Sequence, residues 1–135
     1  MKRVWTDDEV ICRFCDNASI EKAGEIFTAT FGHWKFVQEG LRNKSFEARA
    51  IEVDGVRRYM LIWQKIGTLF RIVACAQLVD GSGEYFPALF TAAKKLAKLY
   101  DCNAIEAITR RAGLVGKMKE LGFETIGVHL TYAIS

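Results

Sequence analysis

The sequence is poor in proline and has no apolar run long enough to cross a membrane. Pro87 is the single proline in 135 residues, and no repeat or low-complexity linker interrupts the chain. The longest apolar runs, such as residues 72–78, are far shorter than the roughly 20 residues of a membrane-spanning helix. The opening stretch MKRVWTDDEV also lacks the apolar core of a secretory signal. We therefore expect one continuous cytoplasmic domain over residues 1–135, with no contact with a membrane.

Neither positive nor negative charge is in large excess. The chain has 19 Lys and Arg against 16 Asp and Glu, which gives a formal net charge of +3. This balance permits an anionic ligand, but acids are interleaved with the basic residues, and no helix-turn-helix or aromatic RNA-binding signature is present. We therefore expect no nucleic-acid partner. The basic residues considered for such a surface are Arg57, Arg58, Lys94, Lys95, Lys98, Arg110 and Arg111.

The four cysteines lack the spacing of a metal site. Cys12 and Cys15 form a CxxC pair, whereas Cys75 and Cys102 stand alone. A structural zinc site usually needs a second such pair, and a thioredoxin-like motif needs the pair at the start of a helix that follows a strand. We therefore predict buried free thiols and no bound metal.

The first third of the chain has a mostly helical pattern. Apolar residues recur every three or four positions from Ile20 to Leu41, with Gly32 and Gly40 as candidate breaks. The start is ambiguous. Thr6 and Glu9 in TDDE have the spacing of a capping box, which would make residues 7–15 a helix. Alternatively, VICRF in the same segment is the first strand, and the sequence does not separate these two interpretations.

The middle of the chain is typical of β-structure. FEARAIEV and RRYMLIWQKI flank Asp54 and Gly55, a pair that favours a type I′ hairpin turn, and a second turn is expected at Gly67. In the next segment, Ile72, Ala74, Ala76 and Leu78 alternate with Val73, Cys75, Gln77 and Val79. Both faces are largely apolar or small. We therefore predict a central strand that is covered on both sides.

The C-terminal half alternates helices and strands. An apolar stripe from Phe86 to Tyr100 predicts a helix, with Pro87 in its first turn. NAIEAIT predicts a strand, LVGKMKEL a short helix ended by Gly122, and residues 126–134 one final strand. The resulting fold class is α/β with a mixed sheet. The piece that runs from strand through loop and helix to strand should form a right-handed parallel crossover.

The segment LVDGSGEYF leads from the central strand into the helix. Gly81, Ser82 and Gly83 would let a phosphate approach the backbone amides at the start of the helix. Alternatively, these are ordinary turn residues, and Ser82 caps the helix. Asp80 and Glu84 would repel an anion, and the loop itself contains no basic residue to offset them.

This order of elements resembles the GCN5-related N-acetyltransferase (GNAT) family. The likeness is best from FEARAIEVDG to KELGFE, where Leu121, Gly122 and Phe123 match a characteristic turn. It implies a single GNAT-like domain, with a mixed sheet flanked by helices on both faces, that uses acetyl-CoA as co-substrate. The stretch RRAGLVGKMKELGF is similar to short proteins of this kind from tailed phages and prophages. The cofactor-binding residues implied are Leu78, Val79, Gly81, Ser82 and Gly83.

The chain departs from the family pattern at several positions. Met118 stands where a tyrosine often serves as general acid, Arg111 where an asparagine is common, and Leu78 where the loop motif has Gln or Arg. The tail after Phe123 is short for the two final strands of the family. These departures leave two functions open: an N-acyltransferase acting on a small-molecule or protein amine, and a non-catalytic assembly or binding protein on the same scaffold.

Glu106 is the candidate catalytic base, because a carboxylate in an apolar strand can become suited to proton transfer. The alternative is a carboxylate that faces solvent or pairs with an arginine. Glu52 is expected to be a surface residue without a catalytic role. Tyr85, Tyr132, His33 and His129 are expected to be structural. Edge pairing through FGHW (residues 31–34) or the final strand would give a homodimer.

Overall fold

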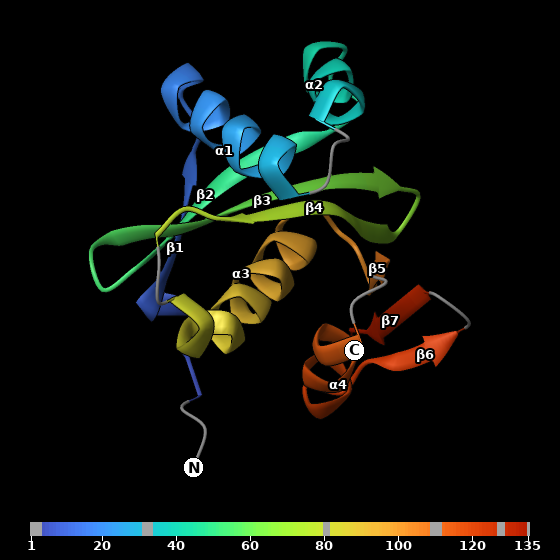
Figure 1. The fold of residues 1–135 in the computed structure, drawn as a ribbon. Coiled ribbons are helices and arrows are strands. Elements are labelled where there is room, and N and C mark those ends of the chain that lie inside the picture. The colour runs from blue at the N-terminus through green and yellow to red at the C-terminus, as the bar shows by residue number, and fades with distance from the viewer. Residues whose placement is uncertain (1–3, 31–33, 80–81, 109–111, 127–128, 135) are drawn as a thin grey trace.

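A mixed seven-stranded sheet forms the middle layer of the protein (Figure 1). The computed structural model describes residues 4–30, 34–79, 82–108, 112–126 and 129–134. Helices α1 (Asn17–Thr30) and α2 (Trp34–Arg42) lie on one face of the sheet. Helices α3 (Phe86–Leu99) and α4 (Ala112–Glu120) lie on the other. The predicted α/β fold class, with helices on both faces, is confirmed.

The strand order in the sheet is β1-β2-β3-β4-β5-β7-β6. Strands β1 to β4 form an antiparallel meander, β4 and β5 are parallel across the α3 connection, and β5, β7 and β6 are antiparallel. The strands are β1 (Val10–Phe14), β2 (Glu47–Val53), β3 (Val56–Ile66), β4 (Leu69–Gln77), β5 (Ala104–Ile108), β6 (Glu124–Ile126) and β7 (His129–Ala133).

The capping box at the N-terminal end forms, but it starts only a short turn. The backbone N–H of Thr6 donates to Oε1 of Glu9 at 3.1 Å, and a 3-10 turn covers Asp7–Glu9. Strand β1 follows directly at Val10. The strand interpretation of VICRF is therefore correct, and a helix over residues 7–15 is wrong.

Both predicted turns of the meander are confirmed. Asp54 and Gly55 have φ angles of 54° and 76°, the left-handed values that a type I′ turn needs, and Gly67 has a φ of 60°. Gly40, in contrast, does not break its helix. It lies within α2, where the ring of Phe46 packs directly over its Cα.

The C-terminal end differs from the prediction of a single strand. Two strands form, β6 and β7, and β7 lies between β5 and β6. The residues that join them, 127 and 128, lie outside the described part of the structure. The short tail is sufficient because β6 is brief and its register pairs Glu124 with Thr131. The sheet thus contains the two final strands for which the tail had seemed too short.

The sheet separates two apolar cores. The larger, here called the α3-side core, contains Trp63 stacked on Phe70 at 5.3 Å between ring centroids. The smaller α1-side core contains Phe46, Met60 and Ile62. Within the described residues, no helix combines the length and the apolar character needed to span a bilayer.

A buried arginine links the edge of the sheet to the end of α3. Arg49 on β2 is 9% exposed. Its guanidinium donates to the carbonyl of Cys12 at 3.2 Å and to the hydroxyl of Tyr100 at 3.1 Å. It also lies 3.7 Å from the ring centroid of Phe14. Because these contacts hold β1, β2 and the residue after α3 together, we assign Arg49 a structural role.

Candidate functional site

Strand β4 carries a β-bulge near its middle. Ile62 pairs with Ala74 and Trp63 pairs with Ile72, so Val73 is an extra residue without its own partner on β3. Val73 and Ala74 therefore both pack on the α1-side core, while Ile72 and Cys75 pack on the α3-side core. The simple alternation expected from the sequence is wrong at this point, because the bulge shifts the pleat by one residue.

Beyond the bulge, β4 separates from β5. The parallel pairing ends at Ile72 and Ala107, although β4 continues to Gln77. Val73, Ala74 and Cys75 are only half-buried, whereas the facing β3 residues 60–63 are at most 1% exposed. Strand β4 is thus central in the sheet, as predicted, but it is not covered along its whole length. Among the described residues, none pairs with the second half of its β5-facing edge, here called the open edge.

The open edge presents backbone amides. The N–H of Leu78 donates to the carbonyl of Arg58 at 2.7 Å, which makes these two residues a hydrogen-bonded pair of the antiparallel ladder. Alternation along the strand then turns the N–H groups of Cys75 and Gln77 away from β3. Backbone N–H groups require an acceptor when they are shielded from water. These two amides can therefore donate to an extended ligand that lies between β4 and β5.

The glycine loop follows this edge directly. Leu78 and Val79 are half-buried at its start, and the side-chain amide of Gln77 donates to the carbonyl of Val79 at 3.1 Å. Ser82 and Gly83 begin a 3-10 turn, Ser82–Tyr85. Asp80 and Gly81 lie outside the described residues, as do the side chains of the turn's first two residues.

The N-cap position of α3 is Tyr85 and not Ser82, the residue that the turn interpretation places there. Tyr85 makes no side-chain capping hydrogen bond. Pro87 occupies the first turn, as predicted, and has no N–H to satisfy. The 3-10 turn Ser82–Tyr85 leads directly into this first turn.

Glu106 lies where β4 and β5 begin to separate. It precedes Ala107, the last β5 residue paired with β4, and its Oε1 lies 2.6 Å from Nε of Arg71. The neighbouring β5 residues pack in the α3-side core, so Glu106 faces the α1 side of the sheet. Its side chain is 12% exposed. The arginine partner considered from the sequence is therefore present.

The structure describes only some of the other residues considered for proton transfer. Met118 is 6% exposed within the α3-side core and has no proton to donate. The ring of Tyr85 packs 5.6 Å from that of Trp5. Tyr132 and His129 lie on β7, but the described structure does not include their side chains, and His33 lies outside the described residues.

The cysteines are free thiols, but only Cys102 is buried as predicted, and the other three are half-buried. Cys12 packs on the α3-side core and Cys15 on the α1-side core, so the CxxC pair does not converge on one point. Burial raises the pKa of the Cys15 thiol to about 11 and that of Cys75 to about 12. Among the residues that the structure describes, no cluster of three or more His, Cys, Asp or Glu has the geometry of a metal site.

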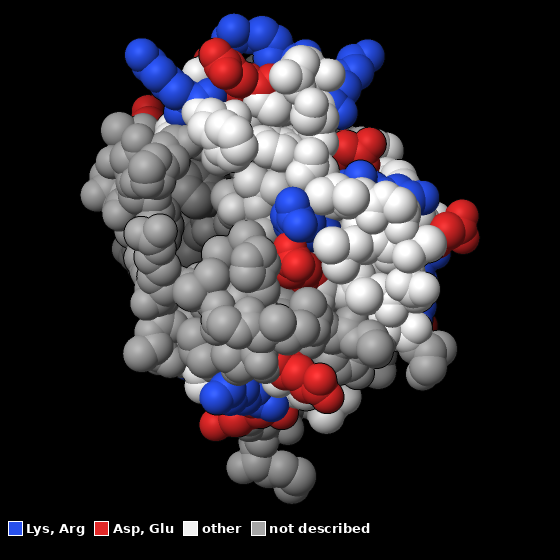
Figure 2. Space-filling view, turned by 90° about the vertical axis from the view of Figure 1, so that its right-hand side faces the viewer, with Lys and Arg blue, Asp and Glu red and all other residues white. Residues whose placement is uncertain are grey.

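Charge on the visible surface is mixed. On the face shown in Figure 2, basic side chains of the described residues lie next to acidic ones. Such mixing favours neither a polyanion nor a polycation as partner. The absence of a nucleic-acid partner stays a prediction.

No protein-family profile and no curated protein matches the sequence. Solved structures do match, and three of them have sequences that are 8–13% identical to this chain. The ribosomal-protein-S18-alanine N-acetyltransferase of Escherichia coli is 11% identical and has a TM-score of 0.73, covering 93% of this chain and 94% of its own.

Two further structures show the same likeness. An acetyltransferase of Bacillus subtilis solved with CoA is 13% identical, with a TM-score of 0.74 over 94% of this chain and 99% of its own. A variant of the spermidine/spermine N-acetyltransferase of Vibrio cholerae is 8% identical, with a TM-score of 0.70 over 93% and 94%. The chain therefore has the fold of the GNAT-family acetyltransferases.

Proposed function

We propose that the protein transfers an acetyl group from acetyl-CoA to an amine. The observation that carries this proposal is the open edge of β4, where the amides of Cys75 and Gln77 point into the space beside β5. A glycine loop and the start of α3 follow this edge in the chain. Neighbours of the same fold were solved with CoA or acetyl-CoA, which supports this choice of ligand.

The open edge can activate a thioester without a special side chain. The amine nitrogen attacks the acetyl carbon, a C–N bond forms, and the C–S bond breaks to release the CoA thiolate. An amide N–H of Cys75 or Gln77 donates to the carbonyl oxygen as negative charge develops on it. Fixed backbone donors of this type lower the barrier because they need no reorganisation during the reaction.

The loop is proposed to hold the pyrophosphate of the cofactor. Leu78, Val79, Gly81, Ser82 and Gly83 would present backbone amides, and the first turn of α3 would add the positive end of its dipole. Glycine at positions 81 and 83 would let the phosphate oxygens approach the backbone closely.

Glu106 is proposed to take the proton from the acceptor amine. It lies beside the point where β4 and β5 separate, on the α1 side of the sheet. Met118 cannot protonate the leaving thiolate. An unperturbed thiol has a pKa of about 8.5, so a thiolate can leave near neutral pH and take its proton from water.

Calorimetric titration with acetyl-CoA and with CoA tests this function. We expect saturable micromolar binding to the wild type. Changing both Gly81 and Gly83 to valine should weaken it by about 100-fold, because the added side chains displace the phosphate from the amides. Gly116→Ala is the control, since a Cβ at Gly116 meets nothing within 4 Å. Absence of binding at millimolar ligand would contradict the proposal.

The acceptor is proposed to be a small-molecule or protein amine. Structural neighbours are named for acetylation of spermidine and spermine and of an alanine of ribosomal protein S18. Spermidine and a peptide with an N-terminal alanine are therefore suitable first acceptors, with release of the free CoA thiol as the readout.

The second candidate is a non-catalytic binding or assembly protein on the same scaffold. The buried Met118, which replaces a proton donor, favours it. Under this alternative, CoA fails to bind and the loop only shapes the fold. A phage origin, a cytoplasmic location and a homodimer stay predictions. Tail and capsid genes beside the coding sequence would support a phage origin. Light scattering would show whether the protein is a homodimer.

A further inference from the structure

Arg58 is the extra residue of a second β-bulge, in β3. Ile51 on β2 pairs with Tyr59 and Glu52 pairs with Arg57, which leaves Arg58 without its own partner on β2. A bulge turns two successive side chains toward the same face of a sheet. It therefore changes where the Arg58 side chain points.

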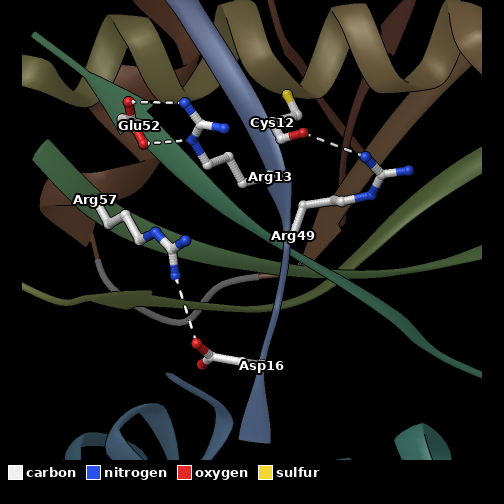
Figure 3. Close-up of polar contacts among 6 residues, drawn as sticks. All are labelled: Cys12, Arg13, Asp16, Arg49, Glu52 and Arg57. Carbon is white, nitrogen blue, oxygen red and sulfur yellow. Dashed lines mark hydrogen bonds and ion pairs between the residues drawn. The ribbon is translucent and has the colours of Figure 1, made fainter. Parts of the chain in front are cut away.

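The bulge places Arg58 on the same face of the sheet as Tyr59, and Arg57 lies on the opposite face. Nη1 of Arg57 lies 3.9 Å from Oδ2 of Asp16, which precedes α1 (Figure 3). Arg58 instead points to the α3 side together with Tyr59, which is buried in the α3-side core. There its guanidinium carbon lies 3.7 Å from the ring centroid of Tyr85.

Arg58 contacts both ends of the glycine loop. Its carbonyl accepts the N–H of Leu78 at the start of the loop, and its guanidinium covers the ring of Tyr85 at the end. Stacking on a tyrosine ring fixes the plane of a guanidinium and leaves its edge free to donate hydrogen bonds. The strand therefore brings a positive charge to a loop that has none in its own sequence.

The charge of Arg58 is not neutralised within the described residues. None of the ion pairs among them involves Arg58, and its Nε is shielded from solvent without a hydrogen-bond partner. The whole residue is half-buried. A shielded N–H donor without an acceptor is unfavourable, and an oxygen of a bound anion would supply that acceptor.

We infer that Arg58 binds the pyrophosphate of the nucleotide cofactor at this loop. This inference rests on the proposed function and adds the cation that the loop sequence lacks. Arginine suits the role because its planar fork can donate two hydrogen bonds to adjacent phosphate oxygens.

The test is calorimetric titration of CoA into the wild type, Arg58→Gln and Arg57→Gln. We expect Arg58→Gln to weaken CoA binding by about 10- to 100-fold, the effect of losing charge-assisted hydrogen bonds. Arg57→Gln changes an adjacent arginine that points away, and it should bind as the wild type does. Arg58→Lys keeps the charge but loses the fork, so it should bind with intermediate affinity. Far-UV circular dichroism establishes that each variant is folded, and Arg58→Lys decides the question if Arg58→Gln does not fold.

A second ligand identifies the phosphate that is bound. Dephospho-CoA lacks the 3′-phosphate but keeps the pyrophosphate, and Arg58→Gln should weaken its binding as much as that of CoA. An effect that disappears with dephospho-CoA would overturn the assignment to the pyrophosphate.

The outcomes separate this inference from the proposed function. If the wild type binds CoA and Arg58→Gln binds it equally well, the inference is wrong and the proposed function stands. If the wild type does not bind CoA, the proposed function fails, and titration with inorganic pyrophosphate decides the role of Arg58. Pyrophosphate binding that is lost in Arg58→Gln would support an anion site, and no binding to the wild type would overturn it.

Discussion

Replacing Glu106 with glutamine is expected to slow acetyl transfer by about 100-fold, the lower end of what a general base contributes. The affinity for acetyl-CoA should not change, because Glu106 faces the α1 side of the sheet and not the loop that is proposed to hold the pyrophosphate. The measurement is the initial rate of CoA thiol release with whichever test amine is acetylated, together with calorimetry of acetyl-CoA.

Glu52→Gln is the matched control for the loss of an ion pair. Oε2 of Glu52 lies 2.6 Å from Nε of Arg13 at the edge of the sheet (Figure 3), the same separation as between Glu106 and Arg71. Both variants remove one carboxylate from one arginine, but Glu52 lies away from the point where β4 and β5 separate. Equal rates for the two variants would show that Glu106 only supports the structure.

Changing Gly40 to alanine is expected to destabilise the protein by about 2 kcal/mol, the middle of the range for overpacking a core. A Cβ at Gly40 would lie 2.0 Å from Cδ2 and 2.3 Å from Cε2 of Phe46, which is itself buried. Helix propensity alone predicts the opposite sign, a gain of about 1 kcal/mol for alanine over glycine. Urea unfolding followed by circular dichroism gives the free energy of unfolding for each variant.

Two variants decide whether the contact with Phe46 is the cause. Gly116→Ala, also in a helix but with open space at its Cβ, should be more stable than the wild type by about 0.5–1 kcal/mol. Leucine at position 46 fills the space above Gly40 less tightly than phenylalanine does. Gly40→Ala should therefore lower the free energy of unfolding less in Phe46→Leu than in the wild type. A stabilising Gly40→Ala would contradict this packing.

The sequence predicts those parts of the fold that local chemistry determines. Asp54 and Gly55 form their turn because both adopt left-handed φ angles, and α3 forms because its apolar stripe has helical spacing. Free thiols are also expected from the sequence, because the CxxC pair has no second pair with which it could form a zinc site. In each case the deciding residues are neighbours in the chain.

The features that shape the site depend on contacts between distant segments. From Ile72 to Ala76 every residue of β4 is apolar or small, so the sequence pattern does not show the shift of the pleat at Val73. The bulge at Arg58 is hidden for a related reason, because a pair of arginines shows no alternation. The sequence therefore identifies the glycine loop, but it shows neither the exposed amides of β4 nor the cation beside the loop.

Residue-resolved amide hydrogen exchange, with and without saturating acetyl-CoA, tests the central claim most directly. In the free protein, the amides of Cys75 and Gln77 should exchange at least tenfold faster than that of Leu78, which is bonded to Arg58, as expected for strand amides without a partner. With acetyl-CoA bound, both should become protected to the level of Leu78. Protection already in the free protein, or exchange that acetyl-CoA leaves unchanged, would contradict a cofactor site along the open edge of β4.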